Sequence, residues 1–513
     1  DGVRQLVDRA LAERWDLLAV PASAMVAGDA PAEALSAFAG RGGTLLLEGL
    51  DARANAVLAR LPIALPAVQS GPVGRRLLIP ARQAAFAGPL GGTEVRAACG
   101  EHVLEPCAAE QVLAWAVGEG GTRAAVVAEH RHGRGRVVLS TLRPAGPAAR
   151  PADVLASERA GGLVAALLLL RRQFGVAAWH APVPIANFTI DDPALRQGML
   201  GLHYDILAAQ ARDHRFHATI ATVPGELPLA DEAVLHRLRR HPDLLSACYH
   251  GCDHEGYEFP PAAARPLAEQ RAALALAVER GLGFARGGGG RLDRVLVFPY
   301  GVGPAALFPE LHRLGFLATC NYWDKYPLDA PVPDEPDLGL RPADVAWEGF
   351  PLLWRRGLDD EGYLLDLLLG RPALLFAHRR DLGRDFLPFV ERARAINAAT
   401  GGAAAWCGLE DVARHAYLQR RRPDAGWEVL MTANEACLHN PGPSPREYTV
   451  TRPGLPEGSA LVADGEAGPG QLSVEVPAEG TALVRVALDG AAAPLADGAR
   501  RCPIDSARPG ARR

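Results

Sequence analysis

Short apolar runs alternate with longer helix-like segments between residues 184 and 420 of the chain. The runs Ile185–Ile190, Val295–Phe298 and Ala373–Ala377 have the length and the composition of buried strands. The segment Leu267–Gly281 has the length of a helix. Strands that alternate with helices form a mostly parallel sheet, so we expect an α/β domain here.

The first 150 residues show the same alternation. A strand at Leu17–Val20, a helix and a strand at Thr44–Leu47 follow one another, and further strands are expected at Arg123–Ala128 and Arg136–Ser140. They predict a mostly parallel sheet. Their order and the "GRGG" turn resemble the flavodoxin-like domains of the class I glutamine amidotransferase superfamily. Because no Cys or Ser stands in a strand–turn–helix elbow near a His, we interpret residues 1–150 as a non-catalytic domain for binding or positioning.

The pattern changes on either side of the central domain. Residues 151–183 predict a helix and a linker. Residues 425–490 alternate apolar and polar positions at period two between Pro- and Gly-rich turns, which predicts a small antiparallel β-sandwich. The last segment, residues 497–513, is rich in Arg, Pro and Gly, and we expect it to be a disordered tail.

Composition narrows the class of protein. A chain of 513 residues with 49% hydrophobic residues predicts two to four globular domains. The net charge of −5 argues against a nucleic-acid-binding protein. The longest apolar run, Gly161–Leu170, is about half the length of a bilayer crossing, so we expect no transmembrane segment. No signal peptide is visible in the sequence, which begins at Asp1. Both a cytoplasmic and an envelope-associated location in a bacterium therefore stay open.

The stretch "FTIDDP" places two acids, Asp191 and Asp192, directly after a predicted strand and before Pro193. One carboxylate at a strand end is ordinary turn or helix-cap chemistry. Two in succession repel each other unless a positive charge lies beside them. The pair therefore raises the question of a bound metal ion.

A possible partner for these acids follows in "YHGCDHEG", where His250 and His254 are spaced by one helical turn. That spacing lets both imidazoles reach one ion. With Asp192 they form a two-histidine, one-carboxylate set, which binds Zn²⁺ or a similar divalent ion and leaves positions open for water and substrate. The same set suits non-haem iron, and an HxxxH pair also occurs by chance.

Two more strand ends carry polar or turn residues. "VFPYG" ends one run with Pro299, Tyr300 and Gly301, and "LLFAH" ends another with His378. Taken singly, the first is an ordinary turn and the second a structural histidine. Parallel-sheet enzymes assemble their sites at the carboxyl ends of strands, which favours a common site for all four segments.

In this order the four segments resemble the motifs of the polysaccharide deacetylase family (NodB-homology, carbohydrate esterase family 4), over about 235 residues. The resemblance implies a distorted (β/α) barrel over residues 184–420 that removes N- or O-linked acetyl groups from glycans with a divalent metal. It implies zinc first, with cobalt, nickel or iron as alternatives. The implied roles are catalytic base for Asp191, general acid for His378, metal ligands for Asp192, His250 and His254, and substrate or oxyanion contacts for Pro299, Tyr300, Gly301 and Trp323.

The chain departs from the family pattern at three positions. Pro193 replaces the glycine after the acid pair, Gly251 replaces the Ser or Thr after the first histidine, and Val297 replaces the motif arginine that pairs with the catalytic base. Asp191 then needs another partner, for which Arg291, Arg294 and Arg341 are the candidates.

We therefore expect a metal-dependent deacetylase that acts on a polysaccharide, in a divergent branch associated with surface-polysaccharide assembly and its proteins. Tyr249, Tyr257, Trp323 and Trp354 are candidates for stacking on sugar rings. Two alternatives stay open. One is a non-catalytic glycan-binding or scaffold protein of a polysaccharide assembly system, and the other is a metal hydrolase of a non-sugar amide.

Overall fold

The computed structural model of the chain describes residues 2–26, 32–71, 74–83, 88–143, 160–199, 202–323, 325–335, 338–488 and 495. The chain divides into two compact units, Asp1–Ala178 and Trp179–Arg513. The beginning of the expected linker, residues 151–159, and the expected disordered tail, residues 497–513, lie outside the described residues.

The first unit contains a mixed sheet of strand order β1-β2-β9-β8-β7-β4-β5. Only β1, β2 and β9 pair in parallel, and the other neighbours are antiparallel. The expectation of a mostly parallel sheet is therefore wrong beyond β9. The strands are β1 (Leu17–Pro21), β2 (Thr44–Glu48), β4 (Arg76–Leu78), β5 (Glu94–Arg96), β7 (Val112–Val117), β8 (Arg123–His132) and β9 (Gly135–Ser140).

The reason lies in the connections between these strands. A parallel crossover needs a dozen or more residues, usually a helix. Among the described residues between β4 and β9, the connections between strands contain short 3-10 turns and no α-helix. The helices of this unit lie elsewhere in the sequence, and β3 (Ala67–Ser70) and β6 (His102–Glu105) form a separate antiparallel pair. The helices are α1 (Gly2–Ala12), α2 (Ala22–Val26), α3 (Ala32–Gly40), α4 (Asn55–Leu58) and α7 (Ala160–Phe174).

Helix α7 is long and apolar enough to cross a membrane by length and composition alone. The window Ala160–Ala177 has a mean hydropathy of 1.3, and 39% of it is buried. A buried core helix passes the same test, and the polar end of α7 is tied to the sheet. Gln173 accepts a hydrogen bond of 2.8 Å from Thr44, and Arg172 forms an ion pair of 2.6 Å with Glu129.

The second unit contains a closed barrel of parallel strands, β10 to β16, arranged in sequence order. Strand β10 pairs with both β11 and β16 and so closes the ring. The short strand β17 (Ala405–Trp406) adds to the start of β10. The ring consists of β10 (Ile185–Asp191), β11 (Ala218–Thr222), β12 (Leu245–Tyr249), β13 (Asp293–Val297), β14 (Ala318–Tyr322), β15 (Leu352–Gly357) and β16 (Ala373–His378).

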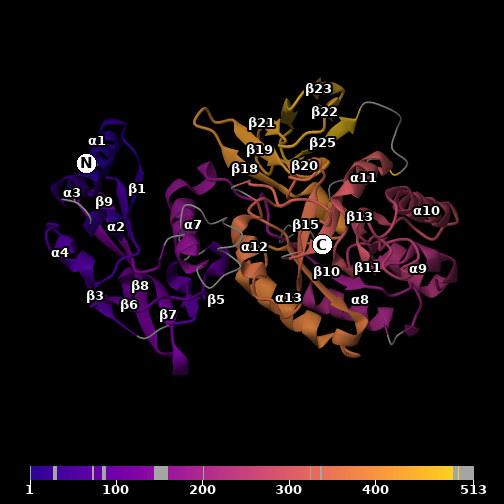
Figure 1. Ribbon diagram of the computed structural model, residues 1–513, viewed down its shortest axis with the longest axis horizontal. Helices are drawn as coiled ribbons and strands as arrows, with labels where there is room; N and C mark the ends of the chain where they lie inside the picture. Colours follow the sequence, from indigo (N-terminus) through magenta and orange to yellow (C-terminus); the bar gives the residue numbers. More distant parts are fainter. Residues whose placement is uncertain are drawn as a thin grey trace. The chain divides into compact units, whose positions relative to one another are not determined.

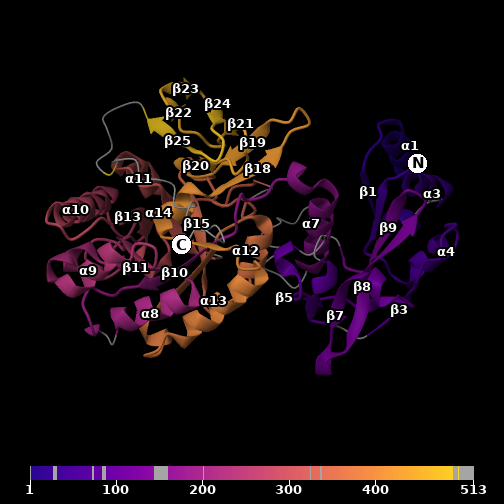
Figure 2. The same cartoon turned by 180° about the vertical axis from the view of Figure 1, so that it is seen from behind.

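Helices surround this ring, and α8, α9, α10 and α13 lie outside it in both views (Figures 1 and 2). Inside, one buried cluster includes Ala221, Cys248, Val295, Cys320 and Leu374, so the barrel is filled rather than hollow. The helices are α8 (Tyr204–His214), α9 (Glu232–Arg240), α10 (Leu267–Arg286), α11 (Phe308–Leu314), α12 (Tyr363–Leu369), α13 (Leu387–Ala399) and α14 (Leu409–Arg414).

Two four-stranded sheets follow the barrel, orange to yellow in Figure 1, and share one buried apolar cluster that includes Val429, Tyr448, Leu461 and Val484. Most neighbours are antiparallel, but β19 and β21 are parallel. One sheet contains β18 (Tyr417–Arg421), β19 (Trp427–Met431), β21 (Arg446–Thr451) and β24 (Gln471–Val476). The other contains β20 (Glu435–His439), β25 (Thr481–Leu488), β22 (Ser459–Ala463) and β23 (Glu466–Gly468).

Candidate metal centre

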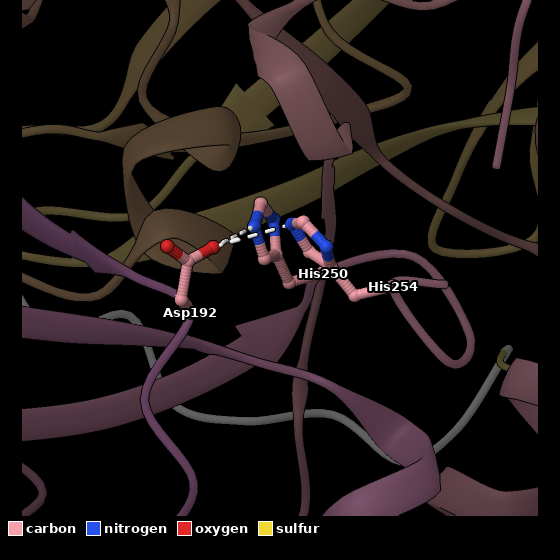
Figure 3. A group of neighbouring side chains, drawn as sticks. All are labelled: Asp192, His250 and His254. Carbon is pink, nitrogen blue, oxygen red and sulfur yellow. Dashed lines mark hydrogen bonds and ion pairs between the residues drawn. The ribbon is translucent and has the colours of Figure 1, made fainter. Parts of the chain in front are cut away.

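Asp192 follows β10 directly and has a left-handed backbone, with a φ of 81°. Its Oδ1 lies 3.1 Å from Nε2 of His250 and 3.3 Å from Nε2 of His254, and Figure 3 shows both imidazoles directed at the carboxylate. One donor atom from each residue lies within 4.8 Å of the other two. The structure thus brings together the three side chains that the sequence singled out as metal ligands.

The two histidines lie on a loop after β12, and the single helical turn expected from their spacing is wrong. Residues 250–254 are all described and none is helical. Gly251 and His254 instead have left-handed conformations, with φ values of 70° and 54°. These reversals place the two rings side by side, with centroids 5.1 Å apart.

The proton positions on His250 test whether the group fits a cation. Its Nδ1 lies 2.8 Å from the carbonyl oxygen of Val297. A carbonyl oxygen only accepts, so Nδ1 carries the hydrogen and donates it. In the neutral ring Nε2 then carries no hydrogen, and its lone pair faces the Asp192 carboxylate. Two electron-rich atoms this close need a proton or a metal ion between them, and a metal-bound histidine has this same outer hydrogen bond.

Asp192 and His254 shift each other's pKa. Partial burial would raise the pKa of Asp192, but the neighbouring imidazoles of His250 and His254 hold that pKa well below its ordinary range. The Asp192 carboxylate in turn raises the pKa of His254. Two imidazole nitrogens and one carboxylate oxygen match the protein ligands of catalytic zinc, with coordination positions left over, and they also match non-haem iron.

The other acid of the pair, Asp191, is buried and bound by Arg355. Two parallel contacts join the guanidinium to the carboxylate, Nη1 to Oδ1 at 2.8 Å and Nη2 to Oδ2 at 3.0 Å. Arg355 is fully buried on β15, with its guanidinium 4.9 Å from the centroid of Phe376 and 5.5 Å from that of Tyr322. Burial opposes its charge, but the attraction of Asp191 raises the pKa of Arg355 above its ordinary value.

The partner of Asp191 is thus none of the three arginines considered from the sequence. Arg291 and Arg294 both pair with Glu410, and Arg341 lies 3.4 Å from Glu335. The side chain of Val297, at the position of the family's arginine, is fully buried. Arg355 was not among the residues singled out from the sequence, and it becomes recognisable only once Leu352–Gly357 is seen to form β15.

His378 lies beside Asp191, because the two residues are register partners on β16 and β10. Its Nε2 is 3.9 Å from Asp192 Oδ2, and its Nδ1 is 3.7 Å from the Asp381 carboxylate. The side chain is 31% exposed. A half-exposed imidazole thus faces the candidate ligand on one side and an acid on the other.

In the "PYG" turn, the ring of Tyr300 lies beside the ring of His254. Tyr300 has a left-handed φ of 62°, and its ring centroid lies 5.4 Å from that of His254 and 5.1 Å from that of Tyr257. Both tyrosines are exposed, at 54% for Tyr300 and 43% for Tyr257. Gly301 is also left-handed, and a Cβ there would lie 2.2 Å from the ring of Tyr322. Pro299 lies against Gly251.

The remaining aromatic candidates lie in other surroundings. The guanidinium groups of Arg356 and Arg371 lie 4.0 and 4.5 Å from the ring centroid of Trp323. Tyr249 and Trp354 are buried, and Trp354 donates a hydrogen bond to Asp344. Among the described residues, no hydrogen bond or ring contact joins Trp323 to the three ligands.

No protein-family model matches the chain, and no curated protein is similar to it. Among solved structures, it is similar to a family 4 carbohydrate esterase from Streptomyces lividans, with 14% identity over 44% of this chain and 92% of that one and a TM-score of 0.27. For the peptidoglycan deacetylase PdaC from Bacillus subtilis the values are 12%, 46%, 92% and 0.27, and for the allantoinase PuuE 15%, 45%, 90% and 0.29. All three of these TM-scores are below 0.5.

Proposed function

We propose that the barrel is a metal-dependent hydrolase that removes N- or O-linked acetyl groups from a glycan. The observation that supports this most is the convergence of Asp192, His250 and His254 beside an acid, Asp191, that is held by an arginine. These residues lie at the carboxyl ends of the barrel strands, and barrel enzymes have their active sites at that end.

Asp192, His250 and His254 would hold the metal. A divalent ion bound there lowers the pKa of water and polarises an acyl oxygen. The orienting contact is already present, because the Val297 carbonyl fixes the ring of His250 with Nε2 toward Asp192. Zinc is the first expectation, since its catalytic sites take three protein ligands of this kind.

Asp191 would act as the general base. Arg355 binds both of its oxygens, which holds the carboxylate in a fixed orientation. In the reaction, the oxygen of a water molecule bonds to the acetyl carbon while Asp191 takes one of the water's protons. The acyl bond to nitrogen or oxygen then breaks and releases acetate.

His378 would act as the general acid. An amine or alkoxide leaves poorly unless it receives a proton as the bond breaks. The imidazole is half exposed, lies on the strand next to Asp191 and contacts Asp381 through Nδ1, which leaves Nε2 on the side of Asp192. Backbone groups at Pro299, Tyr300 and Gly301 would contact the substrate, as would Trp323.

A glycan is the substrate class that we propose, and the exposed rings of Tyr257 and Tyr300 beside His254 support it. Aromatic rings at the rim of a site offer flat apolar surface to one face of a sugar. Partner proteins of polysaccharide assembly and an envelope location are further proposals of the same reading.

Acetate release tests the proposal. Metal-loaded wild-type protein is expected to release acetate from N-acetylglucosamine oligomers or O-acetylated xylan, and a chelator is expected to stop it. Asp191→Asn and His378→Asn should each lower the rate by about 10²–10⁴-fold, the usual contribution of a general base or acid. His236→Asn, an exposed residue of α9, is the matched control and should change nothing.

The substrates distinguish the remaining outcomes. Metal binding without acetate release from any glycan, but with hydrolysis of small amides, would replace the glycan by a non-sugar substrate. Metal binding with no hydrolysis of either class would contradict the enzymatic proposal and favour a binding role.

A further inference from the structure

A buried carboxylate lies inside the loop that carries His250 and His254. Glu258 is only 4% exposed. Its Oε1 accepts hydrogen bonds from the backbone N–H groups of Cys252 at 2.9 Å and Asp253 at 3.2 Å. Its Oε2 accepts from Cys252 at 3.1 Å and from His254 at 3.4 Å. The backbone between the two histidines is therefore wrapped around one side chain.

The glycine after the first histidine makes this arrangement possible. Gly251 has a φ of 70°, and a Cβ there would lie 2.2 Å from Oε2 of Glu258 and 2.7 Å from Cγ of Pro299. Successive N–H groups in a chain that turns through left-handed positions form a concave site for an anion. In this protein the anion is the chain's own carboxylate, which occupies the space that a side chain at position 251 would need.

The opposite side of the loop is held as well. Arg280 of α10 donates from Nη1 to the Cys252 carbonyl at 3.4 Å and to its Sγ at 3.1 Å, and it pairs with Asp253. The Cys252 carbonyl also accepts from the Gly225 N–H at 2.8 Å. These contacts fix the middle of the loop, whereas Glu258 binds the N–H of the ligand residue His254.

Backbone N–H groups are the hydrogen-bond donors to the Glu258 carboxylate. Within the part of the chain that the structure describes, no lysine or arginine forms an ion pair with this carboxylate, and Arg265 binds its backbone carbonyl instead. A buried carboxylate that only backbone dipoles stabilise is costly. A divalent cation on the neighbouring histidines would add positive charge to the loop that encloses this carboxylate.

We propose that Glu258 is a positioning residue of the metal centre. It holds the backbone of His254 in its left-handed conformation, with a φ of 54°, and places a buried negative charge inside the loop that carries both histidines. Both effects strengthen metal binding. The inference rests on the proposed function only in that the three ligands bind a metal, and it does not depend on the substrate.

Metal affinity tests the inference directly. The dissociation constant for Zn²⁺ is measured by competition with a chromogenic chelator, for wild type and for Glu258→Gln. The amide removes the charge and puts an NH₂ group against backbone N–H donors, so we expect affinity to fall by about 10–100-fold, the usual cost of losing a partner outside the ligand shell. Glu255→Gln removes an equal charge from an exposed position of the same loop and should change affinity less than twofold, a negligible effect at about 0.4 kcal/mol.

A spectroscopic readout separates positioning from general damage to the fold. The visible absorption of the Co²⁺-loaded protein reports ligand geometry, and we expect Glu258→Gln to change it while Glu255→Gln does not. Glu258→Asp keeps the charge but shortens the side chain, and it should give an intermediate affinity and an altered spectrum. This variant decides the question if Glu258→Gln does not fold.

The outcomes distinguish this inference from the proposed function. Wild-type affinity and an unchanged Co²⁺ spectrum in a folded Glu258→Gln or Glu258→Asp protein would overturn the positioning role and leave the metal centre intact. Wild-type protein that binds neither Zn²⁺ nor Co²⁺ would overturn the metal centre itself, and this inference with it.

Discussion

At the scale of single residues, the contact between Arg355 and Asp191 joins two buried charges in the barrel interior. The arginine is fully buried and the aspartate 2% exposed. The change Arg355→Met would leave the carboxylate without a partner in the barrel interior. We expect the free energy of unfolding to fall by about 3–5 kcal/mol, the usual cost of breaking a buried ion pair. Urea denaturation of the variant and of wild type measures it.

A double-mutant cycle provides the control for this prediction. The variant Asp191→Asn/Arg355→Met removes both charges, so its loss of stability should be smaller than the sum of the two single losses by about 1 kcal/mol or more. Two single losses that simply add would contradict a direct interaction between the side chains.

Gly251 allows a second test at this scale. The change Gly251→Ser restores the hydroxyl residue of the motif that the loop resembles. It should nevertheless destabilise the protein by about 1–3 kcal/mol, because the residue is left-handed and its Cβ would collide with Glu258. Thermal unfolding and Zn²⁺ affinity report the effect.

Gly256 is the matched control for this substitution. It is left-handed too, with a φ of 58°, but nothing lies within 4 Å of the place its Cβ would take. Gly256→Ser should therefore cost only the backbone strain of about 1 kcal/mol. Equal losses at both positions would show that the contact with Glu258 has no effect.

Residues at strand ends could be recognised in the sequence, and their partners could not. Asp191, Asp192, His250 and His378 each follow an apolar run, so their meeting follows from the geometry of parallel strands. Arg355 is 164 residues from Asp191, and choosing it over Arg291 or Arg294 requires the strand order. Glu258 stands close to His254 in sequence, but its role depends on left-handed residues that no local pattern reveals.

At the scale of elements, α14 and β20 are joined to the barrel through buried charges. Glu435 of β20 accepts from Arg294 of β13 at 2.8 Å and from Arg414 of α14 at 2.9 Å, and all three are buried. We expect Glu435→Ala to lower the free energy of unfolding by about 3–5 kcal/mol, because the buried guanidinium groups of Arg294 and Arg414 both lose their ion pair with Glu435. Calorimetric unfolding measures the loss.

Glu428 provides the comparison for this prediction. It lies on β19 and pairs with Arg420, whose side chain is 42% exposed, so Glu428→Ala should cost only about 0–1 kcal/mol. A Glu435→Ala protein as stable as the Glu428→Ala protein would contradict the structural role of the buried charges.

Elements were predictable where the pattern determines them locally. The strand expected at Ala373–Ala377 is β16, and the helix expected to begin at Leu267 does so. Local pattern does not determine pairing, which is why the antiparallel half of the first sheet was missed. Residues 118–122 join β7 to β8, and residues 133–134 join β8 to β9. In the sequence these short turns show only as isolated glycines such as Gly133.

Across the second unit, three buried histidines predict loss of stability in acid. Burial lowers the pKa of His217, His312 and His415 from 6.5 to about 4 each. The unfolded chain binds these protons below about pH 6.5, whereas the folded protein resists them until about pH 4. Stability that is present above the unfolded pKa is therefore lost as the pH falls toward 4, by up to about 3 kcal/mol for each histidine.

Urea midpoints of metal-free protein across this pH range test the prediction. We expect the midpoint to fall steadily from neutral pH, and His217→Asn to reduce the slope because one proton-binding group is gone. A midpoint that stays constant between about pH 6.5 and 4.5 would contradict the burial of the neutral rings.

At the scale of the whole chain, the succession of an α/β segment, a second α/β segment and a period-two segment was visible in the sequence. The association of the last two in one compact unit was not. It depends on contacts such as that between Arg294 and Glu435, which are 141 residues apart. Charged residues read as surface features in a sequence, and only the fold shows that these are buried.

The most direct test of the central claim is the metal content of purified, reconstituted wild-type protein beside Asp192→Ala and His250→Ala. The account predicts close to one divalent ion per wild-type chain and loss of that ion in both folded variants. Absence of metal from the wild type after reconstitution, or undiminished metal in both variants, would contradict it.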